Sequence, residues 1–235
     1  MDRRALARHL AVFDPARFNP ARVVVLGVGG GGLTIALLIA KLGIENVLVC
    51  DWQEVEPENL GTSLYGRGEI GARKVSAAAR KLRRETFVKP VPYHGDVSTM
   101  KEFGDVVFLC VDSNDLKREL LAKIVALGDK APRRVFEGRM SAKNFLIHSF
   151  NPRNDTHVAR WHDFYLPDEQ VPEELPGCGA VRVALSTAAM MSSSMLVQLF
   201  MDWASWELRG QTGQLVNQVF FDISTFTTEP DSWGE

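Results

Sequence analysis

Cysteine is scarce in this chain, which contains only Cys50, Cys110 and Cys178. Their wide and unequal spacing provides neither a disulfide framework nor the CxxC pair of a zinc site. His157 and His162 are too few additional ligands for a structural zinc, so we expect no zinc. Because so few scattered cysteines are typical of a reducing compartment, we expect the protein to be cytoplasmic.

The chain also lacks an excess of positive charge and an N-terminal apolar run. Its formal net charge is -2 and its pI is about 6.2, so neither nucleic acid nor a membrane surface is expected as a partner. Charges interrupt the N-terminal residues MDRRALARHLAVF, so we expect no signal peptide. The uncharged stretch 183–201 is long enough to cross a bilayer, but its serines, threonine and glutamine favour a buried core helix.

Hydrophobic residues, in contrast, are numerous enough to build one substantial core. They make up 46% of the 235 residues, and no repeat, low-complexity tract or linker divides the chain. We expect residues 1–235 to form a single domain, with residues 1–21 as an N-terminal helix or arm. Residues 151–178 are rich in proline and acidic residues, which predicts a long surface connection, with a crossover-type loop over 151–182.

Apolar β-branched runs alternate with segments of helical periodicity along the chain. We predict strands over 22–26, 46–50, 89–93, 106–111, 135–137, 144–150 and 214–221, and helices over 33–42, 70–85, 114–127 and 183–208. The first strand, helix and second strand form a βαβ unit with a right-handed crossover. The alternation predicts a Rossmann-like α/β fold, a doubly wound and mostly parallel sheet with an antiparallel extension near the C-terminus.

A glycine run, GVGGGG, follows the first predicted strand. Gly27, Gly29 and Gly32 satisfy G-x-G-x-x-G between a strand and a helix, and Gly30 lies among them, where backbone N–H groups and the helix N-terminus can hold phosphate. Asp51, at the end of the next strand, lies where a carboxylate accepts hydrogen bonds from ribose hydroxyls. These features indicate a nucleotide, and on their own they favour a dinucleotide. A glycine-rich turn without a ligand is the alternative.

The segment after Asp51, DWQEVEPENLGTSLYGRGEIGARK, is more specific. Its Asp, the apolar residue four positions later, the Asn-Leu pair eight positions after the Asp and the I-G-x-x-K sequence resemble the nucleotide-binding signature of the ThiF/MoeB/HesA superfamily. The resemblance implies that Asp51 holds the ribose of ATP and that Asn59 and Lys74 approach its phosphates. It also implies that Asp112 coordinates Mg²⁺ or the triphosphate.

The chemistry of adenylation agrees with these roles. Attack of a carboxylate on the α-phosphate requires neutralisation of charge by a cation and a metal, with little covalent participation by the protein. Lys74 and Asp112 provide groups of those types. The alternatives are a solvated helix lysine for Lys74 and a helix cap for Asp112, although one aspartate can both cap a helix and bind a metal.

One position departs from the family pattern. Where the family usually has an arginine three residues after the asparagine, this chain has Thr62, so one phosphate-facing cation is missing. Arg67 is close in sequence and is a candidate replacement. Arg4 and Arg8 are candidates to reach a neighbouring subunit's site, as the N-terminal arginine of family homodimers does, and the resemblance implies a homodimer.

Cys178 lies in the sequence Pro-Gly-Cys-Gly, just before the long predicted helix. By resemblance this is the crossover-loop position at which some family members carry a cysteine that forms a thioester or persulfide. A thiol near a helix N-terminus has its thiolate favoured by the helix dipole, whereas a packed, non-catalytic cysteine is the alternative. Cys50 and Cys110 lie within predicted strands, so we interpret them as buried and inert.

Three functions remain in competition. The first is ATP-dependent adenylation of the C-terminal glycine carboxylate of a ubiquitin-like or sulfur-carrier protein, followed by thioester or sulfur transfer at a cysteine. The second keeps ATP but adenylates a small molecule, a peptide terminus or a modified tRNA base. The third, kept open by Thr62, is a catalytically inactive nucleotide-binding scaffold. An NAD-dependent dehydrogenase is a distant fourth, because no acid/base set for hydride transfer is found.

Overall fold

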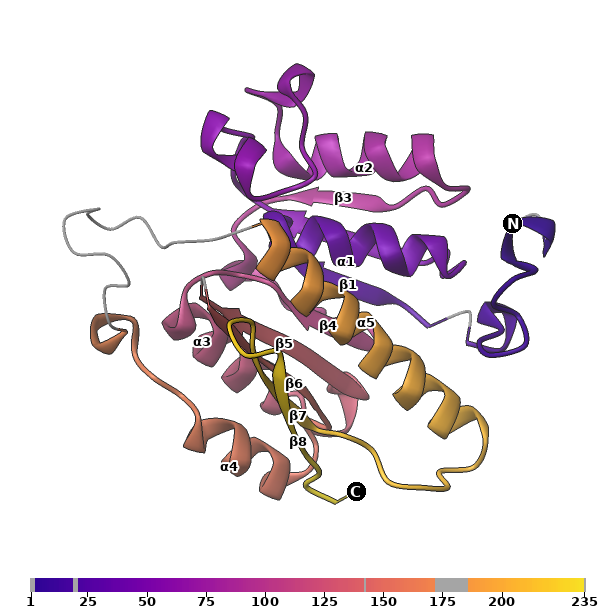
Figure 1. Cartoon of the computed structure of the whole chain (residues 1–235), viewed down its shortest axis with the longest axis vertical. Coiled ribbons are helices and arrows are strands. Elements are labelled where there is room, and N and C mark those ends of the chain that lie inside the picture. Colours follow the sequence, from indigo (N-terminus) through magenta and orange to yellow (C-terminus); the bar gives the residue numbers. More distant parts are fainter. Residues whose placement is uncertain (1–2, 19–20, 142, 172–185, 235) are drawn as a thin grey trace.

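The computed structural model describes residues 3–18, 21–141, 143–171 and 186–234. The described strands are β1 (Val23–Leu26), β2 (Val47–Asp51), β3 (Val91–His94), β4 (Val106–Leu109), β5 (Arg134–Met140), β6 (Asn144–Phe150), β7 (Gln218–Asp222) and β8 (Thr227–Asp231). The described α-helices are α1 (Gly30–Lys41), α2 (Lys74–Glu85), α3 (Asn114–Val125), α4 (Asp155–Asp163) and α5 (Ser186–Leu208). All eight of these strands belong to one sheet in the order β3-β2-β1-β4-β5-β6-β7-β8 (Figure 1).

The sheet changes from parallel to antiparallel part of the way along. Strands β3, β2, β1, β4 and β5 are parallel, and β6, β7 and β8 extend the sheet through antiparallel pairs. The direction of winding reverses between β1 and β4, and in doubly wound sheets ligands bind beyond the carboxyl ends of the strands at such a switch point. The predicted Rossmann-like fold with a C-terminal antiparallel extension is confirmed.

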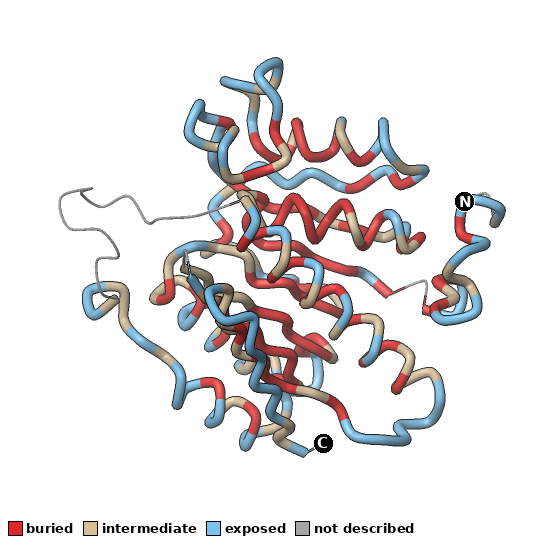
Figure 2. Tube along the Cα trace, viewed as in Figure 1, coloured by how far each residue is buried: buried red, intermediate tan, exposed pale blue. Residues whose placement is uncertain are grey.

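Figure 2 shows that the inner strands are buried and that the helices are partly buried, because helices cover both faces of the sheet. One hydrophobic cluster joins α1, α2 and α5 to one face, and a second joins α3 and α4 to the other. Helix α5 buries Phe200 and Trp203 against Phe136 of β5, which confirms its prediction as a core helix. None of the helices in the described residues combines the length and the apolar character needed to cross a membrane.

Three predictions about elements were wrong in detail, and one strand was missed. Within residues 3–18 of the N-terminal arm, the structure contains the short 3-10 helices η1 (Arg3–Leu6) and η2 (Pro15–Arg17), with turns between them and no α-helix. Helix α2 begins at Lys74 and not at Ile70, because Gly71 has a φ of 79° and the backbone of Arg73 forms an isolated antiparallel β-bridge with that of Glu54. The segment 151–178, predicted as a surface connection, contains α4. Strand β8 was not predicted, because all of its side chains are exposed and give no apolar alternation.

Candidate functional site

The glycine run connects β1 to α1 at the switch point. The backbone N–H of Gly27 donates to the carbonyl of Cys50 over 2.8 Å, and α1 begins at Gly30 without a side-chain cap. A Cβ added to Gly32 would lie 1.9 Å from the carbonyl oxygen of Gly27, so only glycine fits there. The N–H groups of the first turn of a helix have no partner within the helix, and such groups bind phosphate.

Asp51 ends β2 and faces this loop. Its side chain is buried, and its Oδ2 atom accepts a hydrogen bond from the backbone N–H of Val28 over 2.9 Å. Its Oδ1 atom accepts one from the backbone N–H of Gln53 over 2.8 Å. Each carboxylate oxygen has two lone pairs, so one on each remains for ribose hydroxyls. The structure therefore brings together the predicted ribose acid and the predicted phosphate loop.

The segment between β2 and α2 closes back onto the same loop. Tyr65 is buried, and its hydroxyl donates to the carbonyl of Val28 at 2.7 Å and lies 3.2 Å from the carbonyl of Lys74. Burial, followed by the charges of Asp51 and Glu69, raises the pKa of Tyr65, so its hydroxyl stays protonated as a donor. Tyr65 was missed by the sequence analysis, because nothing in its local sequence indicates a contact 37 residues away.

Lys74 begins α2 and is only 6% exposed, so the solvated-lysine alternative is wrong. Its Nζ donates to Oε1 of Gln53 over 2.7 Å, and its backbone N–H donates to the carbonyl of Gln53 over 2.9 Å. Gln53 thus contacts both Asp51 and Lys74, and it too was missed by the sequence analysis.

Asn59 lies in the 3-10 helix η3 (Pro57–Gly61) and is half-buried. Its Oδ1 accepts from the backbone N–H of Glu56 over 3.0 Å, and its carbonyl accepts from the Ser63 hydroxyl over 2.6 Å. Thr62 follows η3, and its carbonyl oxygen would lie 2.3 Å from a Cβ added to Gly30. The backbone at the position that lacks the family arginine therefore lies directly against the first turn of α1.

Asp112 lies beyond the end of β4 and is exposed. The cap of α3 is Ser113, whose hydroxyl accepts from the backbone N–H of Leu116 over 3.1 Å, so the interpretation of Asp112 as the helix cap is wrong. Because β4 is paired with β1 in parallel, Asp112 lies at the same edge of the sheet as the glycine run.

A group of titratable side chains around the buried Glu137 fixes α3 to the end of β5, and we call it the β5 charge cluster. It consists of Lys117, Glu137, Arg139 and His148, and the indole of Trp161 donates to Glu137 beside them. The Lys117 ammonium lies 2.8 Å from Oε1 of Glu137 and donates to the carbonyl of Gly138 over 2.7 Å. Burial raises the pKa of Glu137, but Lys117, His148 and Arg139 outweigh it and hold that pKa well below its ordinary value. The cluster positions the helix that follows Asp112.

Two of the three cysteines lie in the described part of the chain. Cys50 is buried in β2 and Cys110 is half-buried just after β4, and burial raises the pKa of each thiol to about 12, which agrees with the inert role predicted for them. Cys178 lies outside the described residues, together with most of the predicted crossover loop.

The arginines proposed as substitutes for the missing cation are all exposed. Arg67 begins the 3-10 helix η4 (Arg67–Glu69), Arg4 lies in η1, and Arg8 lies in the turn after it. No described hydrogen bond or ion pair joins the Arg67 side chain to the glycine run. Any role of these three residues at a phosphate stays a prediction.

The carboxylate of Asp112 is an oxygen donor of the type that Mg²⁺ prefers, but the described residues do not form a complete metal site around it. Among the described residues no group of three or more His, Cys, Asp or Glu side chains is arranged to hold a metal ion. Mg²⁺ is commonly bound by one or two carboxylates together with substrate phosphates, and the exposed Asp112 carboxylate provides an oxygen ligand of that kind.

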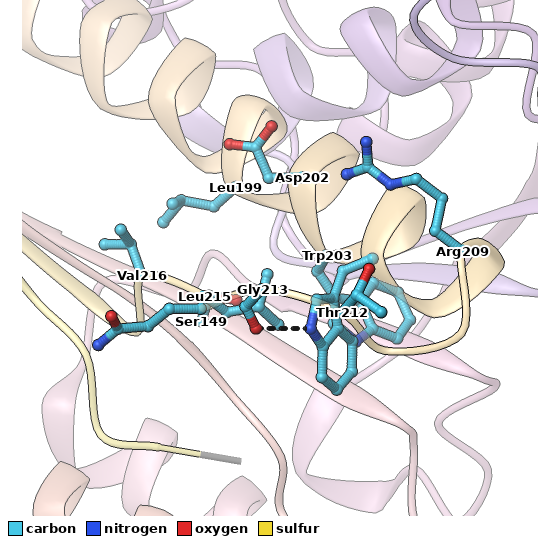
Figure 3. A pocket seen from close by; sticks show the side chains of 11 residues that line it. Ser149, Leu199, Asp202, Trp203, Arg209, Thr212, Gly213, Leu215 and Val216 are labelled. Carbon is cyan, nitrogen blue, oxygen red and sulfur yellow. Dashed lines mark hydrogen bonds between the residues drawn. The ribbon is translucent and has the colours of Figure 1, made fainter.

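A cavity of about 290 Å³ lies far from these residues, at the C-terminal end of α5 (Figure 3). Asp202, Trp203 and Arg209 line it together with the loop that precedes β7, and the indole of Trp206 donates to the carbonyl of Gly213 there. None of the predicted nucleotide-binding residues contributes to its wall.

Known proteins resemble this chain in sequence or in fold. Ubiquitin-like modifier-activating enzyme 5 of Drosophila mojavensis is 28% identical over 141 residues, which are 58% of this chain and 33% of that enzyme. The chain thus aligns with about a third of that relative's length. Among solved structures, PaaA superposes with a TM-score of 0.71 at 14% identity, covering 94% of this chain and 75% of PaaA. Escherichia coli MccB, crystallised with AMPCPP and MccA, superposes with a TM-score of 0.70 at 12% identity, covering 94% and 66%.

The family assignment rests on the sequence itself. The model of the ThiF family matches residues 6–230, which include the glycine run, Asp51, Lys74 and Asp112. The resemblance deduced from the sequence motifs is confirmed: this chain belongs to the ThiF family.

Proposed function

We propose that this protein binds ATP and adenylates the C-terminal glycine carboxylate of a ubiquitin-like or sulfur-carrier protein. The observation that carries the proposal is the bonded unit around Val28. Its N–H donates to the ribose acid Asp51, and its carbonyl accepts from Tyr65, which also contacts the start of α2 at Lys74. This network supports the proposal because it joins the carboxylate proposed for the ribose, the turn proposed for the phosphates and the backbone of the buried Lys74 at the switch point.

Each predicted site residue has a separate role in this proposal. Asp51 accepts the ribose hydroxyls, the first-turn N–H groups of α1 bind the phosphates, and Lys74 and Asn59 neutralise and orient them. The partner's carboxylate oxygen attacks the α-phosphorus, and the bond to the β-phosphate oxygen breaks, so that an acyl-adenylate and pyrophosphate form. Asp112 would hold Mg²⁺ at this site, and the ion would supply neutralisation of the phosphate charge.

Two related proteins support this choice of substrate class. The Drosophila relative is described as activating a ubiquitin-like modifier, and MccB has been crystallised with ATP. MccB has also been crystallised with MccA, which favours a second candidate, adenylation of another carboxylate such as a peptide terminus. Subsequent transfer of the activated partner to Cys178 is part of the first proposal.

The test is exchange of pyrophosphate into ATP, measured with and without a ubiquitin-like protein that ends in Gly-Gly. The variants are Lys74→Ala and Asp112→Ala, with Lys143→Ala and Asp129→Ala as exposed controls of the same charge. Partner-dependent exchange that disappears in the first two variants and persists in the controls is expected. ATP binding without exchange favours a scaffold, for which Thr62 is the motivating residue, and exchange that depends on a small acid favours the second candidate.

We also propose a homodimer in which Arg4 or Arg8 reaches the neighbouring site. If so, an Arg8→Ala chain and a Lys74→Ala chain, each inactive, regain exchange when mixed, because one of the two sites then contains both cations. The same experiment with Arg4→Ala assigns the residue. Failure of both mixtures in a preparation that sediments as a dimer would reject a role in the neighbouring site.

A further inference from the structure

Gln53 lies between the two ends of the proposed nucleotide site. Its backbone N–H donates to Oδ1 of Asp51 over 2.8 Å, and its backbone carbonyl accepts from the N–H of Lys74 over 2.9 Å. Its side-chain Oε1 accepts from Nζ of Lys74 over 2.7 Å. The two backbone bonds fix where the backbone of this exposed residue lies, and from there its amide oxygen reaches the ammonium group of Lys74.

Lys74 forms no ion pair with a carboxylate in the described part of the chain. The side chain is 6% exposed, and no carboxylate oxygen in the described part of the chain lies within 4.0 Å of its Nζ. Lys117 provides the contrast, because it is 3% exposed and lies 2.8 Å from Glu137. A buried cation without a counter-charge is unfavourable, and the arrival of an anion relieves that cost.

We propose that Gln53 is a positioning residue for the triphosphate, an inference that rests on the proposed function. Its neutral amide aims the Lys74 ammonium without cancelling the positive charge, which is left for the phosphates. A glutamate of the same shape at position 53 would hold the ammonium equally well, but it would compete with the phosphates for it. Retaining this charge matters more here because Thr62 contributes none.

The decisive variant is Gln53→Glu, which changes charge with little change in shape. We expect it to weaken ATP binding at least tenfold in calorimetric titration and to change adenosine binding by less than twofold, because adenosine has no phosphates. Gln214→Glu, an exposed position in the loop before β7, is the control for one added negative charge and should leave both affinities unchanged.

A second comparison separates the effect on Lys74 from direct repulsion of ATP. In a Lys74→Met background, Gln53→Glu should weaken ATP binding by less than threefold, because there is no ammonium left to neutralise. A tenfold loss in both backgrounds, an equal loss for adenosine, or no loss at all would overturn the role of Gln53. If the wild type itself does not bind ATP, the proposed function fails first, and this inference fails with it.

Discussion

Replacing Lys117 with methionine tests whether the β5 charge cluster is a buried ion pair that stabilises the fold. The change keeps an unbranched side chain that is one atom shorter and removes the ammonium that lies 2.8 Å from Glu137, a carboxylate with no exposed surface. Removing one partner of a buried pair costs about 3–5 kcal/mol, since the remaining charge is left in a medium of low polarity. Arg139 and His148 still contact Glu137, so we expect the lower end, about 3 kcal/mol.

Urea unfolding followed by circular dichroism measures this change in the free energy of unfolding. The slope with urea should be unchanged, because the folded core stays the same size. Adding Glu137→Gln to Lys117→Met removes the stranded charge, so the double variant should be less destabilised than the sum of its two single variants. A cost below about 1 kcal/mol for Lys117→Met, or strict additivity in the double variant, would refute the ion-pair reasoning.

Four further predictions follow from the same contacts. Gly32→Ala should destabilise the protein by about 1–3 kcal/mol and abolish ATP binding, whereas Gly68→Ala, with open space around it, should do neither in the same unfolding and binding assays. Tyr65→Phe leaves the carbonyl of Val28 without its donor and removes the contact with the carbonyl of Lys74, so the free energy of unfolding should fall by about 1–2 kcal/mol, measured in urea. Because the pKa of Glu137 is lowered by folding, its stabilisation is complete at neutral pH and declines as the pH falls below the unfolded-state value of about 4.3. Urea titrations between pH 7 and 3 should show that decline, with a flatter profile for Glu137→Gln. Thr62→Arg should accelerate pyrophosphate exchange by restoring a cation beside α1, and an unchanged rate would show that another arginine already supplies it.

The fold was predictable where apolar periodicity determines the elements. The runs that form β1, β2 and β4 are buried and β-branched or aliphatic, and such runs have few alternatives to a central parallel strand. Helix α4 was missed because proline and acidic residues around it resemble a loop. Its cap Asn154 and its buried pair His157 and Trp161, four residues apart, were the available signals.

The candidate site was predictable to the extent that it lies in one local motif. Asp51, Asn59 and Lys74 were identified from the resemblance of this segment to the ThiF/MoeB/HesA signature, and the structure places Asp51 against the glycine run and buries Lys74. Gln53 and Tyr65 were missed, because their importance comes from contacts that form only after the segment folds back onto β1. A single sequence contains no record of such contacts, and the local residue types do not mark them.

The contacts around Val28 restrain the turn of the proposed nucleotide site. Both polar groups of its backbone have partners, the N–H with Asp51 and the carbonyl with Tyr65, so the turn cannot rotate without breaking both bonds. Gln53 connects Asp51 to Lys74 within the same segment. Under the proposed function, groups restrained in this way lose less conformational entropy when ATP binds. The affinity for ATP should therefore depend on Gln53 and Tyr65 as strongly as on residues that touch the nucleotide directly.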